Sequence, residues 1–272
     1  MQRPLTFIIP CFNEFNRFPL LSYINFIELR GHFGFLFVND GSTDETMVHL
    51  KKLNNLFPDQ VIILDLPLNK GKAAAVRTGM NFLIENNISE HLLFIDADLS
   101  TPLAEGERIY QILLAQNLQF AFGSRIALFG SKIKRSPTRH YLGRLFATMA
   151  QQIIEARIYD TQCGAKVFHY SLASFLFQKP FTTRWLFDIE IFARLEKRYS
   201  ALQLDNLMME VPLSEWNENS GSKIKLSDIL RIPFVLAKLL LIYRLGRKTT
   251  KFYKERQNSS SVATVPFNER PF

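Results

Sequence analysis

Cysteine is scarce in this sequence, which has only Cys11 and Cys163 among its 272 residues. Two cysteines so far apart are too few for a disulfide framework or a cysteine zinc site. We expect both to be buried apolar side chains and the protein to work in a reducing compartment.

Long uncharged hydrophobic stretches are also missing. The nearest candidate, residues 232–243, is 12 residues long and contains Lys238, whereas a helix needs about 20 apolar residues to span a bilayer. The N-terminus enters the strand-like run LTFIIP without the small-residue pattern of a cleavage site. We therefore expect no transmembrane helix, no signal peptide and a cytoplasmic location.

Two nucleotide-binding motifs are absent as well. The chain has neither the GxxxxGK[ST] loop of P-loop proteins nor a GxGxxG after its first strand, so we expect neither a P-loop NTPase nor a dinucleotide dehydrogenase. A nucleotidyltransferase would also need a glycine-rich loop there. The net charge of +8 favours contact with phosphates, nucleic acid or anionic lipid. Because no RNP, helix-turn-helix or zinc pattern accompanies it, we expect no nucleic-acid partner.

The sequence does contain short apolar runs that alternate with segments of helical period, the pattern of an α/β protein with a mostly parallel sheet flanked by helices. The expected strands are residues 5–9, 33–38, 61–64, 91–95, 119–122 and 202–211. The expected helices are residues 17–29, 44–56, 72–85 and 141–156, and another that begins at Pro102. We expect one catalytic α/β domain over residues 1–225, an amphipathic helix over 226–247 and a disordered tail over 248–272.

Polar clusters follow four of these strands: PCFNE, NDGSTDE, DLPLNKGK and DADLS. In an open parallel sheet, the ligand crevice lies beyond the carboxyl ends of the strands, so the four clusters are predicted to meet at one site. The two carboxylates of DADLS, Asp96 and Asp98, repel each other unless a divalent cation such as Mg²⁺ or Mn²⁺ bridges them. The alternative is that they cap the helix after Pro102.

The segment NKGKAAAVRTGM places Gly71 at the start of a helix, next to Lys72. Backbone amides at a helix N-terminus and nearby cations favour a diphosphate. A nucleoside diphosphate held through metal, lysine and a helix start is therefore the predicted ligand.

Together, the motifs IIPCFNE, VNDGSTDET, NKGKAAAVRTGM and IDADLS resemble the nucleotide-binding half of family 2 glycosyltransferases, the inverting enzymes of GT-A fold that use nucleotide sugars. Later segments, GSR, DTQCGAKVF, RWLFDIE and WNENSGSKI, are similar to the branch that contains dolichyl-phosphate β-glucosyltransferases and other polyprenyl-phosphate sugar synthases. The resemblance runs from about residue 5 to about residue 226.

This resemblance implies a role for each matching residue of the donor site. Asp40 would reach the base or ribose, and Lys72 would lie near the diphosphate. Asp96 and Asp98 would form the metal-binding DxD motif, and Asp96 would be shared with the ribose. Ser100 stands where related mannose synthases have a glutamine ligand. The residues expected to frame the nucleotide sugar besides these are Pro10, Phe12, Asn13, Glu14 and Ala97.

For the acceptor, the resemblance implies a lipid monophosphate bound by arginines of the basic loop 124–140. The candidates are Arg125, Arg135 and Arg139, and the alternative is a solvated basic loop. A phosphate monoester is already largely a dianion at neutral pH, so a strong general base is not required. If one acts, we expect Asp160 or Asp188, and helical spacing predicts that only one of Asp188 and Glu190 points inward.

The segment 226–247 has a broad apolar face with basic residues at both ends, which suits a helix lying on anionic lipid. Packing against the catalytic domain is the alternative. The leading hypothesis is transfer of glucose from UDP-glucose to a polyprenyl phosphate by a protein peripheral to the cytoplasmic membrane face. The runner-up is transfer to a glycan or other hydroxyl acceptor.

Overall fold

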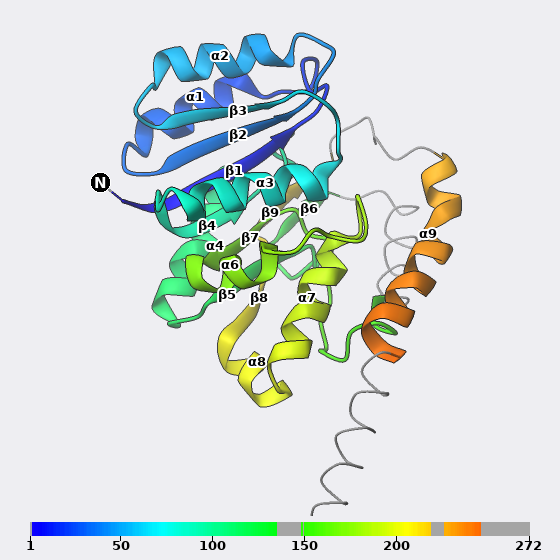
Figure 1. Ribbon diagram of the computed structural model, residues 1–272. Coiled ribbons are helices and arrows are strands. Elements are labelled where there is room, and N and C mark those ends of the chain that lie inside the picture. Colours follow the sequence, from blue (N-terminus) through cyan, green and yellow to red (C-terminus); the bar gives the residue numbers. More distant parts are fainter. Residues whose placement is uncertain (1, 135–147, 149, 219–225, 246–272) are drawn as a thin grey trace, which may run out of the picture.

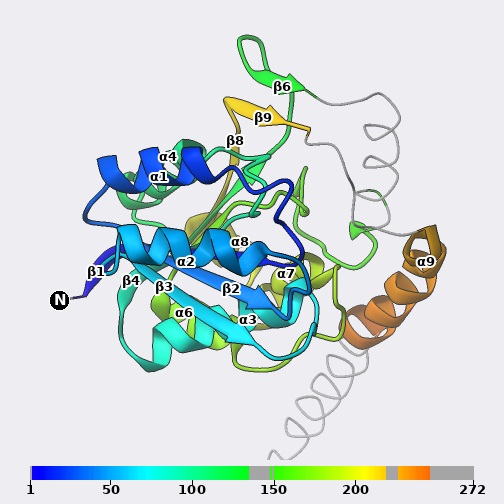
Figure 2. The same cartoon turned by 90° about the horizontal axis from the view of Figure 1, so that it is seen from above.

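The computed structural model describes residues 2–134, 148, 150–218 and 226–245. These residues form a central seven-stranded sheet of order β3-β2-β1-β4-β7-β5-β8, with helices on both faces (Figures 1 and 2). The mostly parallel sheet flanked by helices confirms the expected fold class.

The sheet is parallel apart from one strand. β7 pairs antiparallel with both β4 and β5, whereas the other neighbouring strands pair in parallel. Its strands are β1 (Arg3–Cys11), β2 (Gly34–Asp40), β3 (Val61–Leu66), β4 (Ser89–Phe94), β5 (Phe120–Ser124), β7 (Lys166–His169) and β8 (Met208–Pro212). A small parallel ribbon of β6 (Lys132–Lys134) and β9 (Glu215–Asn217) projects from the body (Figure 2).

The helices of the described chain fall on two sides of this sheet. They are α1 (Leu20–Leu29), α2 (Thr46–Leu56), α3 (Lys72–Glu85), α4 (Leu103–Ala115), α6 (Tyr170–Phe177), α7 (Phe187–Arg198), α8 (Ala201–Leu207) and α9 (Leu226–Leu240), which continues into a π-helical turn, η1 (Leu241–Leu245). One core packs α1, α2 and α4 on one face, and a second packs α3, α6, α7 and the C-terminal helix on the other.

Alternation along the strands explains the two cores, because successive side chains of a strand point to opposite faces. In β1, Ile8 belongs to the core under α3, whereas Phe7 and Ile9 belong to the core under α1. The central strands are buried on both faces, which is why their sequences are continuous apolar runs.

The expected strand at 202–211 is wrong in its first half. Residues Ala201–Leu207 form α8, and β8 begins only at Met208. The cause is a capping box: Ser200 Oγ accepts from the backbone N of Gln203, and the Gln203 side chain accepts from the backbone N of Ser200. The S-x-x-Q pattern that starts a helix is present in the sequence.

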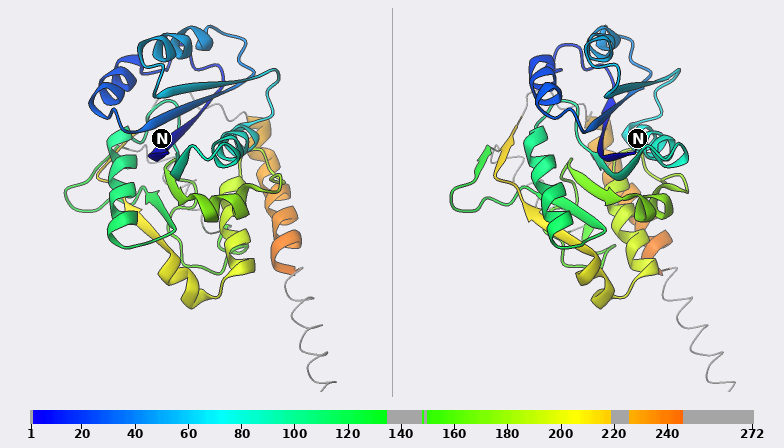
Figure 3. Two further views of the ribbon diagram at one scale, coloured as in Figure 1. Left: turned by 60° about the vertical axis from the view of Figure 1, so that its left-hand side comes forward. Right: turned by 90° about the vertical axis from the view of Figure 1, so that its left-hand side faces the viewer.

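Residues 141–147 of the expected helix at 141–156 lie outside the described residues, and residues 151–156 form turns and irregular backbone. The expected tail, 248–272, lies outside them entirely. α9 and η1 fall within the segment expected to form the amphipathic helix. Figure 3 shows α9 running along the outside of the domain beside α7.

Candidate active site

The candidate site lies at one edge of the sheet, where parallel strands β1, β2, β4, β5 and β8 all end. Because β7 runs antiparallel to its neighbours, its start lies at this same edge. The loops that contain the four polar clusters of the sequence therefore come together with the segment that precedes Lys166.

Asp96 and Asp98 lie on a turn after β4. Leu99 has a left-handed φ of 50°, which is uncommon for leucine, and its backbone N donates to Asp96 O at 3.2 Å. The backbone N of Ser100 donates to Asp98 Oδ1 at 3.0 Å. The chain thus leaves the strand pleat here, and the helix that follows, α4, has no side-chain cap. The alternative that these carboxylates cap it is therefore wrong.

Gly164 forms one wall behind Asp96. A Cβ added to Gly164 would lie 2.1 Å from Asp96 Oδ2 and 2.6 Å from its Cγ. Only a glycine leaves room for the carboxylate at this position, so the start of β7 fixes where Asp96 can lie.

Lys72, the first residue of α3, reaches this carboxylate directly. Its Nζ lies 2.5 Å from Asp96 Oδ1, and it also lies over the rings of Phe94 and Phe187. Burial alone lowers the pKa of Lys72, but the carboxylates of Asp96, Asp188 and Asp98 outweigh it and raise that pKa above the ordinary value. The ammonium is therefore a fixed positive charge at the helix N-terminus.

Asp40, at the end of β2, holds the loop that leads into α3. Its Oδ1 accepts from the backbone N of Lys70 at 2.9 Å, and its Oδ2 accepts from the backbone N of Gly71 at 2.8 Å. Gly71 has a φ of 93°, a conformation that favours glycine. Asp40 therefore shapes the approach to Lys72, and a direct contact with base or ribose stays a prediction.

The loop after β1 contains the residues expected around the nucleoside. Pro10 lies in β1 itself, and Phe12 follows the strand. Asn13 has a φ of 49°, and its side-chain oxygen accepts from the backbone N of Thr43 at 2.8 Å. The backbone N of Glu14 donates to Thr46 Oγ1 at 2.7 Å. The hydroxyl residues of NDGSTDET thus fix this loop, a role that the sequence prediction missed.

Two further contacts join this loop and α1 to the turn that contains the aspartates. Arg17 pairs with Glu14 at 2.8 Å, and its Nη1 lies 4.0 Å from Asp98 Oδ2. The Tyr23 hydroxyl donates to the carbonyl of Ala97 at 3.1 Å. Arg17 is a second cation near the carboxylates that sequence reasoning did not identify.

Arg125 and Asp160, predicted for acceptor binding and for a possible base, form an ion pair with each other. Arg125 Nε and Nη2 lie 2.6 and 2.8 Å from the Asp160 oxygens, and the guanidinium lies over Trp216. Burial raises the pKa of Asp160, but Arg125 outweighs it and lowers the value to about 2. In the same contact the pKa of Arg125 is raised. Arg135 and Arg139, the other acceptor candidates, lie outside the described residues.

Asp188, the other candidate base, is paired with a lysine. Lys166 Nζ is fully buried and lies 2.6 Å from Asp188 Oδ1 and 2.6 Å from the carbonyl of Cys163. Both candidate bases are therefore engaged by cations that the sequence did not assign to them.

Glu190 and Asp188 are both buried, at 0% and 4% exposure, but only Asp188 lies beside the site cations Lys166 and Lys72, as helical spacing predicts. Glu190 turns away from the site. It accepts from the backbone N of Thr182 and of Thr183, both at 2.9 Å, and from the hydroxyl of Tyr243 at 3.1 Å. Its role is to hold a loop and the C-terminal segment.

The C-terminal helix packs against the domain on one face. Leu236, Leu239 and Tyr243 are buried in the core beside α7, whereas Phe234 and Leu241 are 77% and 60% exposed. Packing on the domain, the alternative kept open above, is therefore observed, and an apolar surface remains outside it. Among the helices of the described chain, none has the length and apolarity to cross a membrane.

Comparison with known families gives a match over this same region. The model of glycosyl transferase family 2 matches residues 6–179. A dolichyl-phosphate β-glucosyltransferase of Trichomonas vaginalis is 32% identical over 259 residues, which cover 90% of this chain and 73% of the relative. The enzymes of the same name from Saccharomyces cerevisiae and Homo sapiens are each 30% identical, over 89% and 82% of this chain and 75% and 70% of theirs.

Solved structures share the fold at lower identity. Glucosyl-3-phosphoglycerate synthase from Mycobacterium tuberculosis, crystallised with Mn²⁺, UDP and glucosyl-3-phosphoglycerate, superposes with a TM-score of 0.62 at 16% identity, over 89% of this chain and 80% of that one. The complex of that enzyme with Mn²⁺, UDP-glucose and phosphoglyceric acid also gives a TM-score of 0.62 at 16% identity, over 89% of this chain and 79% of that one. At this identity the likeness establishes the GT-A architecture.

Proposed function

Because this chain belongs to glycosyl transferase family 2, we propose that it transfers glucose from UDP-glucose to a polyprenyl or dolichyl phosphate, with inversion at the anomeric carbon. The proposal rests on the ion pair between Lys72, at the N-terminus of α3, and Asp96 of the Asp-Ala-Asp turn. Relatives that are 30–32% identical carry the name dolichyl-phosphate β-glucosyltransferase, and this name supports the donor sugar and the acceptor.

The donor would lie across the carboxyl edge of the sheet. Pro10, Phe12, Asn13 and Glu14 would frame the nucleoside, because their loop is fixed by Ser42, Thr43 and Thr46. Ala97 lies between the two aspartates with its carbonyl held by Tyr23. Asp40 would act on the donor mainly through the loop that it shapes, since each of its oxygens already accepts a backbone hydrogen bond.

The residues present fit a divalent cation at Asp96 and Asp98. Two carboxylates are hard oxygen donors of the kind that Mg²⁺ and Mn²⁺ prefer. Gly164 leaves the space in which the Asp96 carboxylate lies. When bound, such a cation would offset the negative charge of the diphosphate. Mn²⁺ is the ion in the crystals of glucosyl-3-phosphoglycerate synthase.

The chemistry can proceed without a general base. An oxygen of the acceptor phosphate, largely a dianion at neutral pH, attacks the anomeric carbon as the bond from that carbon to the diphosphate oxygen breaks, and UDP leaves. No proton has to be removed from the nucleophile. Lys72 lies where it can balance the charge that develops on the leaving diphosphate, which is a form of electrostatic stabilisation.

The two candidate bases support this direct attack. Asp160 has a pKa of about 2 because of its pair with Arg125, so it is a weak proton acceptor at neutral pH. Asp188 is held by the buried Lys166. We propose that both carboxylates position these cations and that neither removes a proton.

Arg125 is proposed to bind the acceptor phosphate, together with Arg135 and Arg139. Asp160 engages Nε and Nη2 of Arg125, which leaves Nη1 for a phosphate oxygen. The exposed apolar face of α9, with Phe234 and Leu241, would rest on the lipid surface that carries the acceptor, peripheral to the cytoplasmic membrane face.

A reconstituted assay tests the proposal. Purified protein is incubated with radiolabelled UDP-glucose, Mn²⁺ or Mg²⁺, and dolichyl or undecaprenyl phosphate in detergent; a parallel reaction offers a soluble glycan in place of the lipid. We expect a labelled lipid that releases glucose on mild acid treatment. Label that appears only in the glycan would replace the proposal with the alternative of a hydroxyl acceptor.

A further inference from the structure

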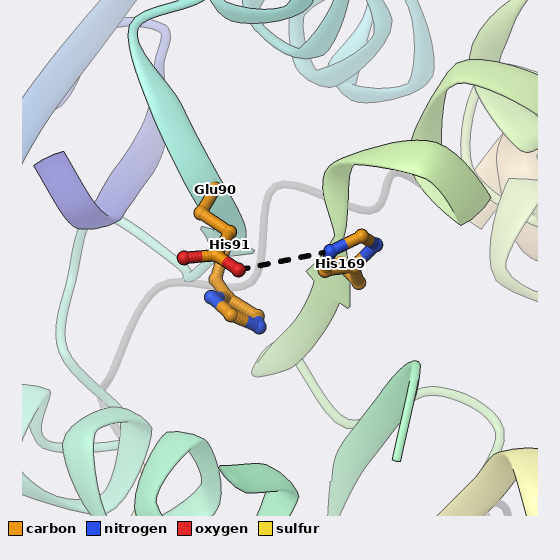
Figure 4. A group of neighbouring side chains, drawn as sticks. All are labelled: Glu90, His91 and His169. Carbon is orange, nitrogen blue, oxygen red and sulfur yellow. Dashed lines mark ion pairs between the residues drawn. The ribbon is translucent and has the colours of Figure 1, made fainter. Parts of the chain in front are cut away.

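We propose that Glu90, His91 and His169 form a second metal site, for an ion of the zinc type, at the edge of the sheet opposite the donor site. Figure 4 shows the three side chains converging at the start of β4 and the end of β7. One ligand atom from each residue lies within 4.8 Å of the other two. In the part of the chain that the structure describes, this is the one group of three such side chains with that geometry.

Strand pairing brings the two histidines together. His91 and His169 are direct partners in the antiparallel register of β4 and β7, a relationship that places side chains within reach of each other. Their ring centroids are 5.3 Å apart. Glu90 lies at the start of β4, where its long side chain turns toward His169, and Glu90 Oε1 lies 4.0 Å from His169 Nε2.

Hydrogen bonds prepare both rings to bind through Nε2. His91 Nδ1 lies 3.2 Å from the carbonyl of Pro4; a carbonyl can only accept, so Nδ1 donates and the neutral ring keeps its lone pair on Nε2. His169 Nδ1 lies 2.7 Å from Ser171 Oγ and can donate to it. Metal-binding histidines commonly have such a partner on the second nitrogen, which fixes the tautomer.

One contact competes with this arrangement. The backbone N of Ser171 lies 3.4 Å from His169 Nδ1 as the cap of α6, and a ring that accepts there carries its proton on Nε2. This bond is longer than the one to Ser171 Oγ. Metal binding at Nε2 of His169 therefore selects the tautomer in which Nδ1 donates to Ser171 Oγ. The longer hydrogen bond from the backbone N of Ser171 is then lost.

The ligand set indicates the kind of ion. Two imidazoles and one carboxylate suit Zn²⁺, with water as a fourth ligand. Ligands about 2.0–2.2 Å from one ion lie closer together than the present side chains do, so the group has to contract. His91 is anchored at 6% exposure, whereas the side chains of His169 and Glu90 are 25% and 57% exposed and can move.

The proposed zinc site lies far from the donor site. His91 and Asp96 are five residues apart along β4 and the turn after it, a span of about 16 Å at the rise of an extended strand. An ion at the histidines would therefore not touch the donor. It would tie β4 to β7, one of the two antiparallel pairings of the sheet, and stabilise the folded chain by binding it in preference to the unfolded one.

Titration of the full chain with ZnCl₂ tests the site. EDTA-stripped protein is titrated by calorimetry, and its melting temperature is measured with and without Zn²⁺. We expect one equivalent to bind and to raise the melting temperature. His169→Gln and Glu90→Gln should lose at least about ten-fold in zinc affinity. Each variant is compared with its own zinc-free melting temperature, because His169 also caps α6, and zinc should raise neither.

Two controls localise the ion. His32→Gln removes an exposed histidine elsewhere, and Asp98→Asn alters a proposed ligand of the donor-site metal. Both variants should bind zinc at the second site as the parent does. Cobalt substitution should give the visible absorption of a tetrahedral ion in the parent and not in His169→Gln. No zinc-dependent stabilisation in the parent, or zinc affinity that His169→Gln leaves unchanged, would overturn the proposal.

Discussion

Lys72 Nζ lies 2.5 Å from Asp96 Oδ1, and this ion pair joins the N-terminus of α3 to the turn after β4. Nucleotide sites in doubly wound sheets commonly use a helix N-terminus beside a strand end. Here a lysine and two carboxylates occupy that junction, so both the sugar diphosphate and a cation have complementary charges within reach.

Replacing Lys72 tests its role in charge stabilisation. Lys72→Met should lower kcat by about 10²–10³, a range typical for loss of one group that stabilises developing negative charge, with a smaller effect on KM. Steady-state rates with UDP-glucose provide the measurement. Lys52→Met, which removes an exposed lysine of α2, is the matched control. An equal loss of kcat in both variants would show that the rate depends on the net charge of the protein and not on the contact between Lys72 and Asp96.

The close approach of Gly164 to Asp96 gives a second prediction. In Gly164→Ala, the added methyl group would lie 2.1 Å from Asp96 Oδ2, so the carboxylate has to move. We expect UDP-glucose affinity in the presence of Mn²⁺ to fall at least about ten-fold, by calorimetry, while the protein remains folded. Gly31→Ala, where nothing lies within 4 Å, should bind like the parent. Unchanged affinity in Gly164→Ala would contradict the placement of Asp96.

Asp160 links stability to pH. Its pKa is about 2 in the folded protein against 3.8 when unperturbed. A carboxyl with a lowered folded pKa stabilises the protein above its unfolded pKa, and the contribution is lost as pH falls from about 3.8 to about 2. Asp160→Asn should lower the free energy of unfolding by about 2 kcal/mol at pH 7, and by about half as much at pH 3.

Urea unfolding of parent and variant at the two pH values measures this difference. Asp59→Asn, at an exposed position, is the matched control. A difference in the free energy of unfolding between parent and Asp160→Asn that stays constant from pH 7 to pH 3 would contradict the ion pair with Arg125.

The buried pair of Lys166 and Asp188 predicts a large effect on stability. Lys166→Met leaves the Asp188 carboxylate buried without its partner, and loss of one member of a buried pair lowers stability by about 3–5 kcal/mol. Lys166→Met with Asp188→Leu removes both charges and should recover much of the loss. Denaturant unfolding of the two variants measures both effects, and a double variant no more stable than the single one would argue against the pair.

The sequence predicts the first half of the fold well because its signals are local. Apolar runs mark β1, β2 and β4, and α3 occupies residues 72–85 as expected, since Gly71 supplies the turn that starts the helix. The apolar residues of the segment 202–211 predict a strand throughout, although the capping box at Ser200 favours a helix over its first half.

The site is only partly predictable for the same reason. Asp96, Asp98 and Lys72 follow from strand-end motifs, which any parallel sheet brings to one edge. The pairs Arg125–Asp160 and Lys166–Asp188 join residues 35 and 22 positions apart, and they depend on the antiparallel insertion of β7, which no local pattern indicates. Pairing of this kind decides whether a carboxylate can act as a base.

Calorimetric titration of UDP-glucose into EDTA-treated protein, with and without Mn²⁺, tests the central claim most directly. If Asp96 and Asp98 bind the cation, Mn²⁺ should raise donor affinity at least about ten-fold in the parent protein and have little effect in Asp98→Asn. Equal donor affinity with and without the metal in the parent protein would contradict it.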